Sequence, residues 1–348
     1  MERQHTLAVI SITPNGNALA QRLARSRQCD CYTSDKLLQT GFIPFEGSFS
    51  QCVERIFLCY SSILFICATG IVIRTIAPLL VSKQVDPAVL VMDEQGKHVI
   101  SLLSGHVGGA NQLTLDIAQL MNADSVITTA TDVNQVAALD MIAQAMNADV
   151  VNYRESVKLV NHMLVSDKRV GLYQQHAQVN DSRGFIIVDD LQQLPELDLL
   201  VWVSFHQQLP TINVPVVQVI PRCIVAGIGC RRETPVQALK QQLETHCHTQ
   251  NIHLSALTSL GSVDIKQDEQ GLLQLAQQLN LPLSFYSADE LAPHQHHFPQ
   301  SEFVHKTLGI GSVSQPVAWL MSHGHLYGET LKQQGITITL GVIPCCMS

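Results

Sequence analysis

The sequence carries little charge and has no excess of basic residues. Charged side chains make up 14% of its 348 residues, and 29 acidic residues outnumber 21 lysines and arginines, for a formal net charge of -8. Proteins that bind nucleic acids usually carry a basic patch or stripe, so this class of partner is disfavoured. An anionic small ligand stays open, because it responds mainly to the charges that line its own site.

The ten cysteines include no C-x-x-C pair, and we expect neither a signal peptide nor a membrane span. Zinc-binding and thioredoxin-like sites need such closely spaced pairs, so both are excluded. The most apolar stretch, residues 56–76, is interrupted by Ser61, Gly70 and Arg74. A membrane-spanning helix needs about 20 predominantly apolar residues, so this stretch predicts a buried strand and a loop instead. We therefore expect a cytoplasmic protein with no membrane partner.

What the chain has is a high share of hydrophobic residues, 46%, arranged in alternating strand and helix patterns. Strand patterns include residues 6–13, 62–69, 125–132 and 223–230, and residues 88–103 predict a hairpin. Such alternation predicts the α/β class, with two layered α/β domains of mostly parallel sheets joined by a small middle segment. The expected domains are residues 1–150 and 222–348, with residues 151–221 as either a connecting segment or a small middle domain.

The stretch LLSGHVGGANQLTLD, residues 102–116, places glycines directly before an amphipathic helix, although glycine costs a helix about 1 kcal/mol relative to alanine. The glycines are Gly105, Gly108 and Gly109. Helix starts carry unpaired N–H groups that attract anions, and glycine lets a ligand approach them. The stretch at residues 102–116 matches neither a P-loop nor the dinucleotide-binding fingerprint. His106 is a candidate donor or base, or a structural histidine of its own turn. Asn111 is a candidate amide donor or a helix cap.

Two other predicted strand ends carry polar residues. Gly70 and Arg74 follow the strand at 62–69, and ligands of open α/β sheets bind outside the carboxyl ends of strands. An arginine there suits a carboxylate or phosphate, although a surface arginine after an ordinary turn is the alternative. Thr131 and Asp132 end the strand pattern at 125–132, where they either reach the same crevice or cap the next helix.

Similar strand-to-helix junctions recur in the second half of the chain. Gly229 and Arg231 lie in GIGCRRETP, and Lys266 and Glu269 lie between a predicted strand and a predicted helix. A further glycine loop covers residues 309–312. The number of anion-friendly helix starts suggests a large polyanionic ligand rather than a single phosphate.

Long stretches of the chain resemble the cobalt-precorrin-5A hydrolase family of anaerobic cobalamin biosynthesis. TGIVIRTIAPLLVSKQVDPAVLVMDEQGKHVISLLSGHVGGANQLTLDIA and VITTATD resemble the family's N-terminal module. GIGCRRETP, SVDIKQDEQGLLQLAQQLNLPLSFYSADEL and ITITLGVIP resemble its C-terminal module. The resemblance covers nearly the whole chain, more loosely through residues 151–221. Gln315 and Pro316 depart from a more acidic, alanine-rich helix in the family, so no ligand role is assigned to residues 309–316.

The resemblance implies a hydrolase that acts on carbon–carbon bonds of a cobalt corrinoid. The implied reaction opens the δ-lactone on ring A of cobalt-precorrin-5A and releases acetaldehyde, giving cobalt-precorrin-5B and beginning ring contraction. The acetate and propionate groups of this macrocycle fit the predicted polyanionic ligand. The cobalt belongs to the substrate, so we expect no metal site or cofactor in the protein. A homodimer and contacts with other enzymes of the pathway are left open.

Lactone hydrolysis needs an activated water and stabilisation of an oxyanion. As a hypothesis, His106 is the general base, with Glu269 as the alternative base, and the N–H groups of Gly108 and Gly109 bind the oxyanion or a carboxylate. The basic residues expected to hold acid groups are Arg74, Lys83 and Arg231. The other residues assigned to substrate binding are Gly70, Gly105, Asn111, Thr131, Asp132, Gly229 and Lys266.

Two other classes of function stay open at this stage, because the sequence contains no unmistakable catalytic dyad. One is a protein that binds and transfers corrinoid intermediates without chemistry. The other is an α/β enzyme that acts on a phosphorylated metabolite. Acetaldehyde release from cobalt-precorrin-5A separates the hydrolase from both.

Overall fold

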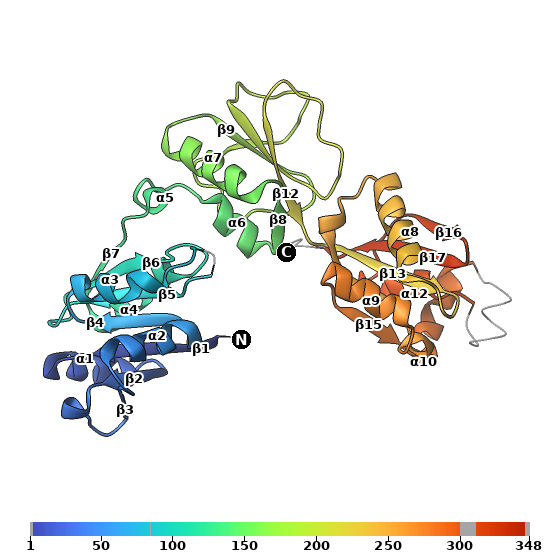
Figure 1. Cartoon of the computed structure of the whole chain (residues 1–348). Coiled ribbons are helices and arrows are strands. Elements are labelled where there is room, and N and C mark those ends of the chain that lie inside the picture. Colours follow the sequence, from blue (N-terminus) through green and yellow to red (C-terminus); the bar gives the residue numbers. More distant parts are fainter. Residues whose placement is uncertain (1–2, 84, 300–310, 345–348) are drawn as a thin grey trace. The chain divides into compact units, whose positions relative to one another are not determined.

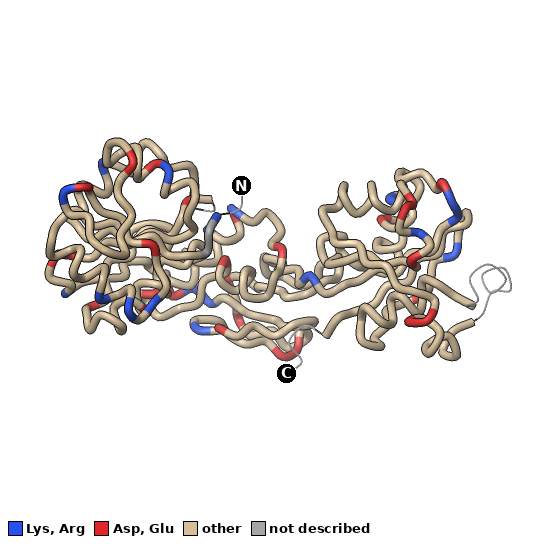
Figure 2. Tube along the Cα trace, turned by 90° about the horizontal axis from the view of Figure 1, so that it is seen from below, with Lys and Arg blue, Asp and Glu red and all other residues tan. Residues whose placement is uncertain are grey.

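The computed structural model describes residues 3–83, 85–299 and 311–344, and the chain divides into two compact units, Met1–Val136 and Ala137–Ser348 (Figure 1). Charged residues of both signs are interspersed along the trace, with long uncharged stretches between them (Figure 2). Within the described ranges, no helix has the length and apolar character needed to cross a membrane.

The first unit is built on a seven-stranded sheet with the order β3-β2-β1-β4-β5-β6-β7. Neighbouring strands are parallel except β5 and β6, which form the predicted antiparallel hairpin. The bounds are β1 (Gln4–Ser11), β2 (Cys29–Thr33), β3 (Phe42–Pro44), β4 (Tyr60–Ile66), β5 (Ala88–Met92), β6 (His98–Leu103) and β7 (Asp124–Val126).

Helices cover both faces of this sheet, because the central strands are apolar on both sides. Side chains of α1 and α4 pack on one face, and those of α2 and α3 pack on the other. The bounds are α1 (Pro14–Ala24), η1 (Asp35–Leu37), α2 (Phe49–Cys59), α3 (Thr69–Ile76), η2 (Ala77–Leu79), α4 (Ala110–Met121) and α5 (Ala130–Val133). The start of α3 corrects our expectation of a loop after β4, and α5 shortens the strand expected at 125–132.

The second unit begins with a five-stranded sheet, so the middle of the chain is more than a connecting segment. Its order is β10-β9-β11-β12-β8, parallel except for β12 and β8. The bounds are α6 (Leu139–Ala145), β8 (Ala148–Val150), α7 (Tyr153–Val165), β9 (Val170–Gln174), β10 (Ile186–Val188), β11 (Leu199–Val203) and β12 (Val216–Pro221). Because β8 pairs with β12, residues 137–150 lie with this sheet, and the first unit ends at Val136.

A second five-stranded sheet, β15-β14-β13-β17-β16, completes the unit. Helices α8 and α9 pack on one face, and α12 packs on the other. The bounds are β13 (Ile224–Cys230), α8 (Val236–Thr249), η3 (Leu254–Ala256), β14 (Leu257–Val263), η4 (Asp264–Lys266), α9 (Gln270–Leu279), β15 (Leu283–Tyr286), α10 (Ala288–Leu291), η5 (Ala292–His297), α12 (Ser314–Met321), β16 (Leu326–Gln333) and β17 (Ile336–Val342). The α/β class with mostly parallel sheets is confirmed.

Candidate functional site

Side chains from two neighbouring strand ends converge at the start of α4. The imidazole Nε2 of His106 lies 3.0 Å from the Thr131 hydroxyl and 3.3 Å from Asp132 Oδ2. The loop of His106 follows β6, whereas Thr131 and Asp132 follow β7. These strands are parallel neighbours, so their carboxyl ends meet at one edge of the sheet. The sequence predicted all three residues, and the structure brings them together.

Asn111, in the first turn of α4, hydrogen-bonds to side chains from both strand ends. Its amide nitrogen donates to Asp132 Oδ2 at 2.9 Å and to the Thr129 hydroxyl at 3.0 Å. Its amide oxygen accepts a hydrogen bond from the Ser101 hydroxyl at 2.6 Å. The amide therefore binds side chains of the protein, which favours a positioning role over the expected contact with substrate. We call His106, Asn111, Thr129, Thr131 and Asp132 the His106 cluster.

The His106 cluster is partly accessible to solvent. Asn111 and Thr131 are buried, at 7% and 5% exposure, whereas the side chains of His106 and Asp132 are 17% and 41% exposed. The reactive groups therefore face solvent on a buried polar support. An imidazole beside a carboxylate is suited to general base catalysis, because the carboxylate stabilises the cation that forms when the ring takes a proton.

The glycines before α4 shape this loop. A Cβ on Gly108 would lie 2.3 Å from Ser104 Cβ, and a Cβ on Gly105 would lie 2.6 Å from Asn111 Oδ1. Gly109 is the N-cap of α4 with φ 85°, a left-handed conformation that favours glycine. Two glycines thus permit close packing inside the loop, and the third permits its turn.

The amides at this helix start are largely occupied, which corrects the prediction that they await an anion. The Gly109 N–H donates to the His106 carbonyl at 2.7 Å. The N–H groups of Ala110 and Asn111 donate to the carbonyls of Ser104 and Gly105, at 3.1 and 2.9 Å. Gly109 is therefore not available as an oxyanion donor in this conformation, and of the two predicted donors only the Gly108 N–H stays a candidate.

Gly70 and Arg74 lie away from the His106 cluster. Leu103, at the end of β6, is level with Val89 in β5, and Val89 is level with Ile63 near the beginning of β4. The β5/β6 hairpin reverses the chain, so β4 and β6 end at opposite edges of the sheet. Gly70 follows β4 in the first turn of α3, and the Arg74 guanidinium donates back to its carbonyl at 3.2 Å.

Lys83 lies in the loop that leads into β5, on the same edge as His106. The Ser104 hydroxyl, just before the His106 loop, donates to the Asp86 carbonyl at 3.1 Å. Asp86 is buried, and its carboxylate accepts the Val81 N–H at 3.1 and 3.2 Å. Val81 and Asp86 are thereby bonded to each other and to the start of the His106 loop.

In the second unit, the two predicted residues of the β14–α9 junction pair with each other. Lys266 Nζ lies 3.3 Å from Glu269 Oε2, and their side chains are only 12% and 3% exposed. A buried carboxylate held by a lysine is a poor candidate for activating water. The pairing therefore favours His106 over Glu269 as the base, although neither role is tested by the structure.

Other predicted site residues of the second unit lie against, or bond to, neighbouring residues of the protein. A Cβ on Gly229 would lie 2.5 Å from the Thr337 hydroxyl of the neighbouring strand. Arg231 is exposed and lies over Gly335. In the loop before α12, Gly309 lies outside the described residues. The N–H groups of Gly311 and Ser312 both donate to the Gln295 side-chain oxygen, at 3.0 and 2.9 Å.

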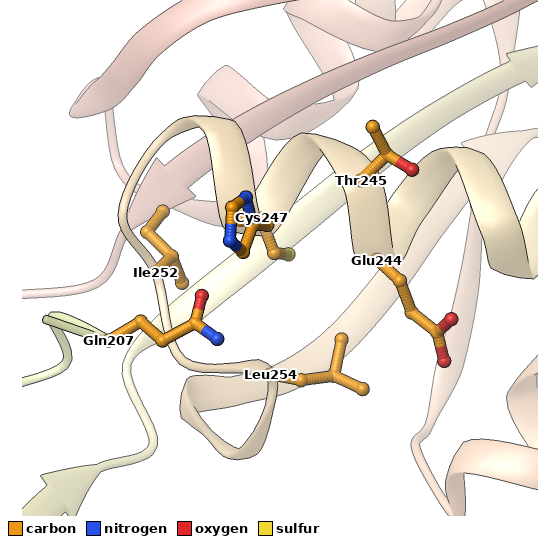
Figure 3. A pocket seen from close by; sticks show the side chains of 7 residues that line it. Gln207, Glu244, Thr245, Cys247, Ile252 and Leu254 are labelled. Carbon is orange, nitrogen blue, oxygen red and sulfur yellow. The ribbon is translucent and has the colours of Figure 1, made fainter.

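A pocket of about 490 Å³ lies in the second unit, between α8 and the segments around Gln207 and Ile252 (Figure 3). Its lining residues are Gln207, Glu244, Thr245, Cys247, His248, Ile252 and Leu254. None of them was predicted from the sequence as a site residue. Within residues 3–83, 85–299 and 311–344, no three His, Cys, Asp or Glu side chains are grouped to hold a metal ion.

Ser101 was missed as a member of the polar network. Thr129 was given no role of its own, although it belongs to the TTATD stretch, whose hydroxyls were expected to reach the crevice or cap the next helix. Ser101 interrupts the apolar strand β6, HVISLL, and a lone hydroxyl in such a strand signals a buried polar partner.

Comparison with known proteins gives consistent matches along the chain. Three family models match: cobalamin synthesis G N-terminal at residues 51–132, cobalamin biosynthesis central region at 137–221, and cobalamin synthesis G C-terminus at 224–341. The chain is 50% identical over 345 residues to the cobalt-precorrin-5A hydrolase of Salmonella typhimurium, with 98% of each protein covered. It is 30% identical to the protein of that name from Priestia megaterium, covering 97% of this chain and 95% of the relative. A crystal structure of a cobalamin biosynthesis protein G homolog from Sulfolobus solfataricus is 18% identical, covers 97% of each chain, and has a TM-score of 0.40.

Proposed function

The chain belongs to the cobalt-precorrin-5A hydrolase family, and from this premise we propose that it hydrolyses cobalt-precorrin-5A in cobalamin biosynthesis. The reaction opens the ring A δ-lactone and releases acetaldehyde, giving cobalt-precorrin-5B. The observation that carries the residue-level proposal is the convergence of His106, Thr131 and Asp132 at the start of α4.

His106 acts as the general base in this proposal. It takes a proton from water as the water oxygen attacks the lactone carbonyl, and the Asp132 carboxylate at 3.3 Å stabilises the imidazolium. Collapse of the tetrahedral intermediate frees an alkoxide. That oxygen becomes the aldehyde oxygen of acetaldehyde when the carbon–carbon bond to the macrocycle breaks and its electron pair passes to the macrocycle with a proton. General base catalysis of this kind contributes about 10²–10⁴-fold in rate.

The other groups of this edge have supporting roles. The Gly108 N–H is the proposed oxyanion donor, since the Gly109 N–H is bound to the His106 carbonyl. Lys83 is the proposed partner of an acid side chain of the substrate, because its loop is tied to the His106 loop through Ser104 and Asp86. Arg74 and Arg231 stay predictions as carboxylate ligands. Arg74 lies at the opposite edge of the sheet from the His106 cluster, and Arg231 belongs to the second unit.

The proposal assigns no resident metal or cofactor, because the cobalt arrives with the substrate. A cytoplasmic location is part of the proposal, because it suits an enzyme of a biosynthetic pathway. A homodimer and contacts with neighbouring enzymes of the pathway stay predictions.

The test is acetaldehyde release by the purified full chain supplied with cobalt-precorrin-5A, together with the His106→Ala variant. We expect stoichiometric acetaldehyde from the wild-type protein and a loss of about 10²–10⁴-fold in turnover for the variant. Binding of the corrinoid without acetaldehyde from the wild-type protein would instead support an intermediate-carrying protein. Unchanged turnover in His106→Ala would remove this residue from the mechanism while leaving the activity intact.

A further inference from the structure

The 80–87 loop, which leads from η2 into β5, presents large apolar side chains to solvent. Val81 is 79% exposed, Val85 53% and Leu80 45%. Val81 is the most exposed large hydrophobic side chain of the described residues. A single exposed apolar residue needs no explanation, but three within one short loop beside a candidate site suggest a binding surface. We call Leu80, Val81 and Val85 the apolar lip.

Polar contacts beneath the apolar lip hold it in place. The Val81 N–H donates to both oxygens of the buried Asp86 carboxylate. The N–H groups of Val85 and Asp86 donate to the Ser82 carbonyl at 3.1 and 2.9 Å, and the Arg3 guanidinium donates to the Val85 carbonyl. These bonds hold the backbone at Val81, Val85 and Asp86, and the side chains of Val81 and Val85 are exposed.

The apolar lip lies at the same edge of the sheet as the candidate site. The Ser104 hydroxyl bonds to the Asp86 carbonyl, which joins the loop of the lip to the loop of His106. The register of β5 and β6 agrees, because Val89 at the start of β5 is level with Leu103 at the end of β6. A ligand resting on Val81 and Val85 would therefore lie at the same sheet edge as the base.

The charges around the lip fit a ligand that combines an apolar body with acid groups. Lys83 lies between Val81 and Val85 in the sequence, and the Arg3 guanidinium bonds to the same loop. The one acidic residue of the 80–87 loop, Asp86, is 7% exposed and turned toward the Val81 amide. The 80–87 segment therefore contributes a basic side chain and no outward-facing carboxylate of its own.

We propose that the apolar lip binds an apolar face of the corrinoid macrocycle while Lys83 faces one of its carboxylates. This inference rests on the proposed function and names where that substrate sits. A second protein is a weaker occupant, because a stable interface buries about 800 Å² on each partner, which is more than three such side chains supply. A flat macrocycle needs only a few apolar contacts of this kind.

The test uses cobyrinic acid, a cobalt corrinoid with acetate and propionate groups that lacks the reactive lactone. It is titrated into the full chain and into the double variant Val81→Ser, Val85→Ser. We expect the Kd of the double variant to rise about tenfold, because the bound ligand would no longer cover two apolar side chains. Ile43→Ser is the matched control, since Ile43 is 40% exposed on β3 at the other end of the sheet, and its Kd should not change.

An unchanged Kd in the folded double variant would overturn the inference, and so would absence of cobyrinic acid binding by the wild-type chain. A change of oligomeric state in the double variant with unchanged corrinoid binding would assign the lip to a protein partner and overturn it as well. Acetaldehyde release is measured in parallel. If the wild-type chain binds cobyrinic acid through the lip but releases no acetaldehyde from cobalt-precorrin-5A, the proposed hydrolysis fails and the binding surface stands.

Discussion

The glycine-bearing loops before α4 and α12 serve different purposes. Before α4, the glycines close a loop whose His106 meets Thr131 and Asp132 from the next strand end. Before α12, the N–H groups of Gly311 and Ser312 donate hydrogen bonds to the Gln295 side chain of the same chain. Glycines at a helix start therefore serve the backbone conformation of the loop. The loop becomes a candidate site only where the topology brings chemically active side chains to it.

The largest expected difference between these two loops is in turnover. His106→Ala should lower kcat for acetaldehyde release by about 10²–10⁴-fold, because it removes the proposed base. Gln295→Ala should leave kcat unchanged and lower only stability, by about 1 kcal/mol for each of its lost hydrogen bonds. Equal losses of kcat in both variants would contradict the distinction.

Alanine substitutions test whether the glycines are needed for packing. Gly108→Ala places a Cβ 2.3 Å from Ser104 Cβ, and overpacking of this kind costs about 1–3 kcal/mol. Gly109→Ala has open space but a φ of 85°, which costs roughly 1–2 kcal/mol. Urea unfolding measures both. In the second unit, Gly227→Ala should be at least as damaging as Gly108→Ala, because its Cβ would lie 2.1 Å from the Ser314 carbonyl oxygen.

Asn111 should act on catalysis through the groups that it positions. Asn111→Ala should lower kcat about tenfold with little change in KM, because Thr129 and Asp132 lose a donor but the substrate loses no contact. Asn111→Asp should be worse, since two carboxylates would then face each other. Asn161 in the second unit bridges the Leu139 N–H and Asp140 in a similar way, so Asn161→Ala should reduce stability without changing kcat. A large rise in KM for Asn111→Ala would instead indicate direct substrate binding.

The last expected effect is on the pH dependence of stability, and it concerns His176, a histidine outside the proposed site. Burial and the neighbouring His206 lower the pKa of His176 from 6.5 to about 4. Between these values the unfolded chain binds more protons than the folded chain, so stability should fall as pH decreases from 6.5 toward 4. His176→Gln should flatten this dependence in urea unfolding. A slope unaffected by the substitution would show that other groups are responsible.

The sequence predicted much of the fold because strand and helix patterns are local. The apolar runs of β1, β4, β13 and β17 and the β5/β6 hairpin are where they were expected. The consequence of the hairpin was missed. It reverses the chain, so the ends of β4 and β6 lie at opposite edges and Gly70 is separated from His106. The strand order of the sheet at residues 148–221 was not predicted, and its strand β8 is too short to give a periodic signal.

The candidate site was predictable where two strand ends are parallel neighbours, as for His106, Thr131 and Asp132. Whether a candidate residue is available to a ligand was not predictable where its polar groups pair with other side chains of the protein. Nothing in the spacing of Lys266 and Glu269 distinguishes a buried ion pair from a base and its ligand. Likewise, no pattern near Gly311 predicts its hydrogen bond to Gln295, which lies earlier in the chain. Such pairings depend on packing, which a single sequence does not display.

The most direct measurement compares acetaldehyde release by Asp132→Asn and Glu269→Gln, each supplied with cobalt-precorrin-5A under single-turnover conditions. If the pair of His106 and Asp132 activates water, Asp132→Asn loses most of its rate, whereas Glu269→Gln, once shown to be folded, keeps it. Full activity in Asp132→Asn together with a loss in Glu269→Gln would contradict the assignment of the site to the start of α4.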